Sequence, residues 1–105
     1  MNTFAARILA ANDKNVKMLI QALKRIGVSV KPDSGDDYTL VGKDPGSPKL
    51  KAAAKEAGWK QQAQTQFPDG DGNYYLEAKS ASGFDSQAVL NFKEGTAFLL
   101  EEGNW

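Results

Sequence analysis

Eight basic side chains in this sequence have the spacing of a surface that binds phosphate groups. They are Lys14, Lys17, Lys24, Arg25, Lys49, Lys51, Lys55 and Lys60. The first four lie in a predicted helix near the N-terminus, and the other four lie in or just after a second predicted helix. If both helices cover one face of a sheet, these residues form a single patch that attracts a nucleic-acid backbone. A solvated helix surface is the favoured interpretation, because nucleic-acid binders usually add arginine and this chain has only Arg7 and Arg25.

A second candidate site lies at the C-terminal end and would bind a protein. Its residues are Phe98, Glu101, Glu102 and Trp105. The last predicted strand, over residues 96–102, is expected at an edge of the sheet, where unpaired N–H and C=O groups can pair with a partner strand. The two glutamates would discourage self-pairing and attract a basic partner, while Trp105 would add apolar contact area. The alternative is a strand inside the sheet, with Trp105 packed against it as a lid.

The sequence offers little for catalysis or metal binding. It contains no histidine and no cysteine, which removes the commonest general base, the commonest metal ligand and a thiol nucleophile. Asp69, Asp71 and Asn73 alternate like the first ligands of a calcium loop, but Tyr74 and Ser80 stand where that loop needs glycine and glutamate. We therefore expect a tight turn there, with no bound metal, no cofactor and no catalytic site. An enzyme that works through carboxylates, lysine or tyrosine is the less favoured alternative.

Charge is divided between the two parts of the chain. Residues 1–60 carry eleven Lys or Arg and six Asp or Glu, a net charge of +5. Residues 61–105 carry two Lys and seven Asp or Glu, a net charge of −5, so the total is zero. Such an asymmetry is typical of a chain with an interaction surface, although it does not identify the partner.

Hydrophobic periodicity predicts the elements that position these residues. An apolar stripe indicates a helix over residues 13–26, and a second helix over residues 47–57 begins at Ser47 and Pro48. Strands are predicted over residues 3–10, 28–30, 38–41, 59–67, 74–80, 88–93 and 96–102, with a helix as the alternative for the first. The predicted fold is a single α+β domain over residues 1–105, with two helices on one face of a mostly antiparallel sheet. Its order matches a ferredoxin-like βαββαβ start with extra C-terminal strands.

Length and composition point to a small soluble domain. The 105 residues are 41% apolar, which is enough for one modest core, and no apolar run approaches the roughly 20 residues of a membrane span. The first residues lack the pattern of a signal peptide, so we expect a cytoplasmic protein with no membrane partner.

Two functions remain open at this level. The preferred one is a small interaction module that binds a protein stoichiometrically, as an inhibitor or adaptor of a larger protein; small phage and mobile-element proteins provide the analogy, by size alone. The alternative is a nucleic-acid-binding protein that uses the Lys-rich helical face. Salt separates the two, because phosphate binding weakens linearly with the logarithm of salt concentration and an apolar interface responds less. The partner and the oligomeric state stay open.

Overall fold

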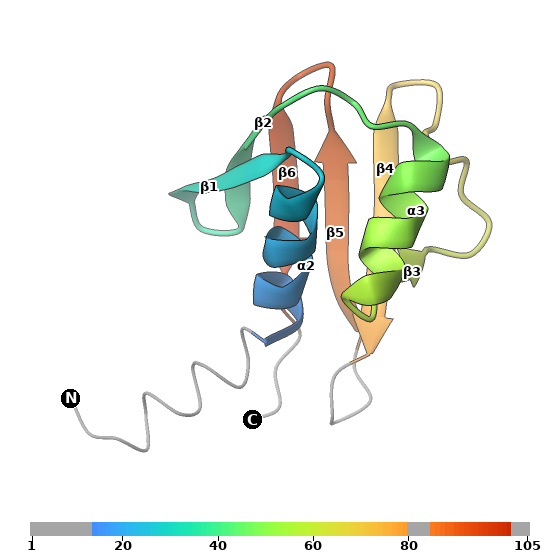
Figure 1. Cartoon of the computed structure of the whole chain (residues 1–105), viewed down its shortest axis with the longest axis horizontal. Helices are drawn as coiled ribbons and strands as arrows, with labels where there is room; N and C mark the ends of the chain where they lie inside the picture. The colour runs from blue at the N-terminus through green and yellow to red at the C-terminus, as the bar shows by residue number, and fades with distance from the viewer. Residues whose placement is uncertain (1–13, 80–84, 102–105) are drawn as a thin grey trace.

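Residues 14–79 and 85–101 are the part of the chain that this structure, a computed structural model, describes. They form two helices and six strands (Figure 1). In chain order these are α2 (Lys14–Arg25), β1 (Ser29–Ser34), β2 (Asp37–Val41), α3 (Ser47–Glu56), β3 (Lys60–Gln61), β4 (Asn73–Lys79), β5 (Asp85–Asn91) and β6 (Thr96–Leu100). The strand expected over residues 3–10 lies outside the described residues. Neither α2 nor α3 is long and apolar enough to span a membrane.

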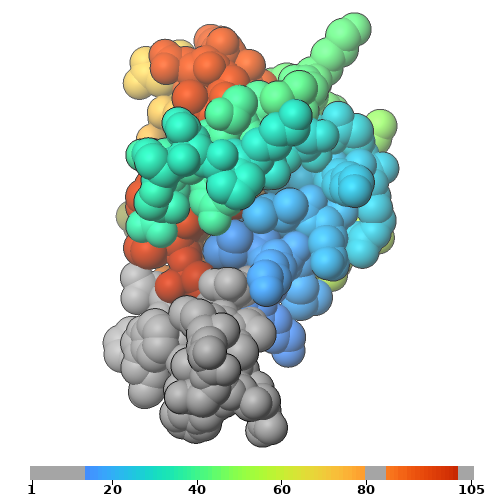
Figure 2. Space-filling view, turned by 90° about the vertical axis from the view of Figure 1, so that its left-hand side faces the viewer, coloured from blue at the N-terminus to red at the C-terminus, as the bar shows by residue number. Residues whose placement is uncertain are grey.

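All six strands belong to one sheet in the order β1-β2-β6-β5-β4-β3, and every neighbouring pair is antiparallel. The two helices lie side by side on one face of this sheet (Figure 1), and a side view shows α2 and β6 in separate layers (Figure 2). The predicted class, two helices on one face of a mostly antiparallel sheet, is therefore confirmed. The ferredoxin-like order is not confirmed, because β6 and β5 lie between β2 and β4.

Both helices form where the periodicity predicts them, to within one residue at each described end. The apolar stripe of α2 is buried at Val16, Leu19, Ala22 and Leu23. After α2 the chain passes through Gly27, whose φ of +86° suits glycine and ends the helix. The buried face of α3 is thinner, since it consists of one leucine and two alanines, and these small side chains let α3 lie close to the sheet.

Alternation along the central strands directs their buried side chains toward the helices. These side chains are Tyr74, Leu76, Ala78, Ala88, Leu90, Ala97 and Leu99. The intervening residues point to the opposite face, where Tyr75, Val89 and Phe98 form a row across β4, β5 and β6. No helix or strand among the described residues covers that side, which we call the open sheet face. Phe98 is 36% exposed on it.

The C-terminal strand is not an edge, so the strand-pairing prediction made for it is wrong. β6 pairs with β2 on one side and with β5 on the other, which leaves β1 and β3 as the edges. Ala97 and Leu99 of β6 are buried beneath the helices. The buried backbone of such a strand forms the most hydrogen bonds when strands pair with both of its sides. Of the four candidate residues at this end, Phe98 and Glu101 are described, whereas Glu102 and Trp105 lie outside the described residues.

Glu101 has a structural contact rather than a free position on an edge. Its carboxylate accepts hydrogen bonds from the backbone N–H of Val16 at 2.8 Å and from the hydroxyl of Ser86 at 2.7 Å. The first turn of a helix has unpaired N–H groups, so this carboxylate caps α2 from a distant part of the chain. The expectation that Glu101 guards an exposed edge is therefore wrong.

The strand predicted over residues 59–67 is much shorter in the structure, where only Lys60–Gln61 form β3. Beyond it, side chains bond to nearby backbone and take the place of ladder hydrogen bonds. The Thr65 hydroxyl donates to the Gln62 carbonyl at 2.7 Å, and the Gln61 amide donates to the Thr65 carbonyl at 2.7 Å. Gln64 has a φ of +63°, which turns the chain away from an extended path. The alternation of apolar and polar residues could not reveal that side-chain hydrogen bonds to the backbone would replace the strand pairing here.

Candidate functional site

The structure places seven of the eight predicted basic residues on α2 and α3, and the eighth, Lys60, on β3. All eight are exposed. The two helices carry a single acidic residue, Glu56, so their net charge is +6 from seven basic residues and one acidic residue. The rest of the described chain has five lysines and ten acidic residues, a net charge of −5. The division seen along the sequence has thus become a basic helical layer on an acidic remainder.

The basic residues of α2 lie along the side of the helix opposite its buried stripe. Lys14, Lys17, Lys24 and Arg25 are exposed there, and no acidic residue occupies the first turn. Lys24 and Arg25 fall in the last turn, where the helix dipole favours positive charge. We call these four residues together with the three lysines of α3 the helical face.

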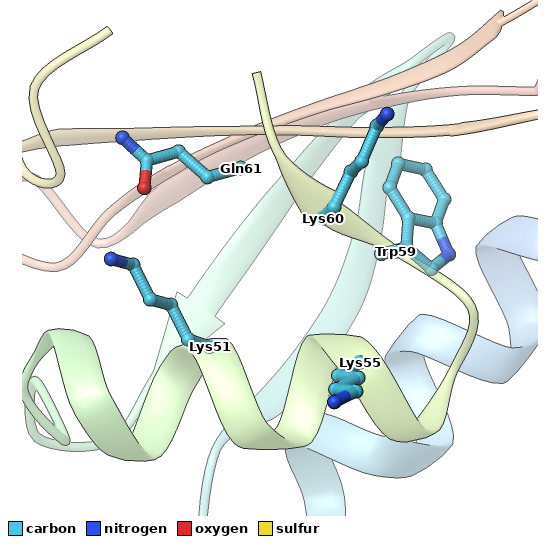
Figure 3. Close-up of a pocket in the computed structure, with 5 residues that line it drawn as sticks. All are labelled: Lys51, Lys55, Trp59, Lys60 and Gln61. Carbon is cyan, nitrogen blue, oxygen red and sulfur yellow. The ribbon is translucent and has the colours of Figure 1, made fainter. Parts of the chain in front are cut away.

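A pocket of about 450 Å³ lies between α3 and the short edge strand β3 (Figure 3). Its lining residues are Lys51, Lys55, Trp59, Lys60 and Gln61. The first two are four positions apart and therefore share one side of the helix. Lys49 does not line the pocket, since two residues along an α-helix are separated by roughly 200° around its axis. The structure therefore separates Lys49 from the lysines with which the sequence had grouped it.

The lysines of the pocket differ in what they contact. Lys51 rises from α3 toward Gln61 (Figure 3), with its Nζ atom 5.6 Å from the centre of the Phe67 ring. The Lys60 Nζ atom is 3.8 Å from a carboxylate oxygen of Glu77, which partly neutralises it. No carboxylate lines the pocket itself. The arrangement can hold an anion, chiefly through Lys51 and Lys55.

Trp59 connects this pocket to the core and to α2. Its side chain is only 2% exposed, and its indole N–H donates to the Asn15 carbonyl at 2.8 Å. Its backbone N–H donates to the Ala54 carbonyl of α3 at 2.8 Å. The two bonds hold the segment between α3 and β3 in place, so one wall of the pocket is rigid. The sequence predicts a strand from residue 59, and its only sign of the pocket is the pair of lysines one helical turn apart.

A hydrogen-bonded pair positions the start of α3. The buried Tyr74 hydroxyl donates to the carboxylate of Asp44, with distances of 2.8 and 3.0 Å to its two oxygens. The same carboxylate accepts the backbone N–H of Gly46, just before α3, at 2.8 Å. The Tyr74 ring also makes edge contacts with Phe67 and Phe92, at centroid distances of 4.7 and 5.8 Å. Burial, followed by the hydrogen bond to Asp44, raises the pKa of Tyr74 to about 12.

The acidic turn around residue 70 uses its carboxylate on its own backbone. One oxygen of Asp69 accepts the N–H groups of Asp71 and Asn73, each at 2.9 Å. The bond from Asn73 is the main cause that lowers the pKa of Asp69, and the hydrogen bond to Asp69 raises the pKa of Tyr75. Residues 14–79 and 85–101 contain no group of three or more acidic side chains placed to hold a metal ion.

Comparison of the chain with protein-family models, with curated proteins and with solved structures finds no match.

The Tyr74–Asp44 pair predicts a loss of stability at high pH. The tyrosine pKa is 10.0 without the protein environment and about 12 in the folded chain. The unfolded state therefore releases its proton first, so this interaction stabilises the fold fully below pH 10 and is lost as the pH rises through about 12. Denaturant titrations across that window should show a steeper fall in the free energy of unfolding for the unmodified protein than for Tyr74→Phe.

Tyr75→Phe is the comparison variant, because Tyr75 lies next along the strand and outside the core. Its pKa is raised as well, by the hydrogen bond to Asp69, but less than that of the buried Tyr74, so Tyr75→Phe should flatten the pH dependence less than Tyr74→Phe. Equal pH dependence of the unmodified protein and Tyr74→Phe would show that the buried hydroxyl is not held neutral.

Proposed function

We propose that the protein binds nucleic acid through the helical face. The observation that carries this proposal is the separation of charge between the layers: seven basic residues and one acidic residue on the two helices, against an acidic remainder. A surface of this kind attracts phosphate backbones and releases their condensed counterions. The acidic residues elsewhere would keep the backbone away from the open sheet face and so orient the complex.

The chemistry of the helical face favours binding without strong sequence preference. Six of its seven basic side chains are lysines, which act as flexible point charges. Arg25 is the one arginine described, and bidentate reading of guanine depends mainly on arginine. The face therefore contacts phosphates more readily than base edges. A cytoplasmic location, expected from the sequence, belongs to this same proposal.

Strand addition at a sheet edge has less support than it had from the sequence. β1 contains Pro32, which lacks an N–H, and its pairing with β2 shifts register between Pro32 and Ser34. β3 has two residues. Proline, irregular pairing and shortness all make an edge a poor template for a partner strand.

A protein-binding module remains the second candidate, on a different surface from the one first expected. Phe98 is exposed at the centre of the open sheet face, in a row with Val89, Tyr75 and Asp37. An exposed aromatic side chain beside other apolar or aromatic residues, here Val89 and Tyr75, is typical of the anchor of a protein interface. The partner would be a protein that the domain binds stoichiometrically, as an inhibitor or adaptor would.

Substitution of basic residues on the helical face tests the first proposal. The triple variant Lys14→Gln, Lys24→Gln and Lys49→Gln removes three charges away from the pocket. Each lost phosphate contact should reduce the slope of log affinity against log salt by about 0.7 for a single-stranded oligonucleotide. Fluorescence anisotropy with a labelled oligonucleotide, measured over a series of salt concentrations, gives the slope.

The control is Lys31→Gln, Lys79→Gln and Lys93→Gln, which removes equal charge from strands and a loop outside the helical face. Its slope should match that of the unmodified protein. Equal slopes for both triple variants would contradict binding through the helical face, as would an unmodified protein that binds no oligonucleotide at about 50 mM salt.

The second candidate has its own test at Phe98. Phe98→Ser removes the exposed aromatic group without changing charge. A host protein that co-purifies after nuclease treatment should be lost with this variant and kept with the matched substitution Met18→Ser, on the exposed side of α2. Retention of the protein by Phe98→Ser would exclude the open sheet face as its interface.

A further inference from the structure

We infer that the pocket between α3 and β3 binds one nucleotide of a single strand, with its phosphate on Lys51 and Lys55. This inference rests on the proposed binding of nucleic acid. It adds the pocket as a binding site for one nucleotide, and it specifies single-stranded nucleic acid as the ligand. The remaining basic residues of the helical face would then follow the neighbouring phosphates.

The size of the pocket suits this ligand. A volume of about 450 Å³ lies within the range of roughly 300–1,000 Å³ that small-molecule sites occupy, and it exceeds what a phosphate group alone would fill. The space left beside a phosphate can therefore receive the sugar and part of the base.

The charges of the pocket favour a phosphate near α3. Lys51 and Lys55 stand one helical turn apart, so both ammonium groups can reach the same phosphate or two successive ones. The contact of Lys51 with the Phe67 ring, at 5.6 Å, is a weak attraction at an exposed site and can be exchanged for a phosphate. Lys60 is held by Glu77 at 3.8 Å, and it contributes a long-range attraction rather than a direct contact.

The rest of the lining suits the remainder of a nucleotide. The methylene stems of the lysines provide apolar contact, and Trp59, which is 2% exposed, adds little surface to it. The Gln61 amide nitrogen donates one of its two hydrogens to Thr65, so this side chain can offer its second N–H and its amide oxygen to a base. A base inside a duplex cannot enter such a pocket without leaving its stack, so the site selects single strands.

Adenosine 5′-monophosphate is the probe that tests the pocket, with adenosine and inorganic phosphate as separate arms. Binding is measured by isothermal titration calorimetry. The double variant Lys51→Gln and Lys55→Gln should weaken binding of the monophosphate about tenfold. The double variant Lys31→Gln and Lys93→Gln, which removes equal charge outside the helical face and the pocket, should change it less than about twofold. A salt series with an oligonucleotide, as above, is run on the same proteins. Single-stranded DNA should bind more tightly than the duplex of the same sequence.

The outcomes separate the subsite from the function on which it rests. Two results overturn the pocket and leave the proposed binding through the helical face intact: oligonucleotide binding without monophosphate binding, or equal monophosphate binding by the Lys51/Lys55 and the Lys31/Lys93 double variants. Monophosphate binding that depends on Lys51 and Lys55, without oligonucleotide binding, supports the pocket and overturns the proposed function. Equal binding of inorganic phosphate and the monophosphate overturns the nucleotide assignment, and equal affinity for duplex and single strand overturns the choice of single strands. If neither probe binds, both proposals are wrong.

Discussion

Burial of apolar side chains on one face of the sheet determines where the two helices lie and which of their sides face solvent. The buried side chains of β4, β5 and β6 alternate onto the same side, and the helices must cover that side to remove them from water. Burying a leucine is worth roughly 1.5–3 kcal/mol, so Leu19, Leu23 and Leu50 hold the helices there with several kilocalories per mole. The outward sides of both helices then face the same direction, so the helical layer is basic, with Lys51 and Lys55 on the side of α3 toward β3 and Lys49 on another side.

Polar contacts across the chain set the orientation of the helical layer. The Glu101 carboxylate caps the start of α2 by accepting the N–H of Val16. The indole N–H of Trp59 donates to the carbonyl of Asn15, the residue before Val16. Asp44 joins the start of α3 to the buried Tyr74. Each bond links residues at least 30 positions apart, except the local one at Gly46. Long-range hydrogen bonds therefore fix the helices that carry the helical face and one wall of the pocket.

Much of this arrangement could be predicted from the sequence where local patterns decide it. The two helices followed from apolar spacing, and their common face followed from the class of fold. The position of β6 could not be predicted, because strand order depends on pairing between distant segments rather than on the strand itself. The prediction of a long strand after Trp59 is wrong for a local reason, since the side chains of Thr65 and Gln61 form hydrogen bonds with nearby backbone. The pocket depends both on the pairing of β3 with a distant strand and on the local hydrogen bonds that end β3. Of its features, only the pair of lysines could be predicted from the sequence.

In the proposed function the helical face, and not the open sheet face, contacts nucleic acid. Backbone amide NMR spectra recorded during titration with a short single-stranded oligonucleotide test it most directly. The chemical shifts should change along α2, α3 and β3, and those of Val89 and Phe98 on the open sheet face should stay constant. Changes centred on Val89 and Phe98, with α2 and α3 unaffected, would contradict the claim.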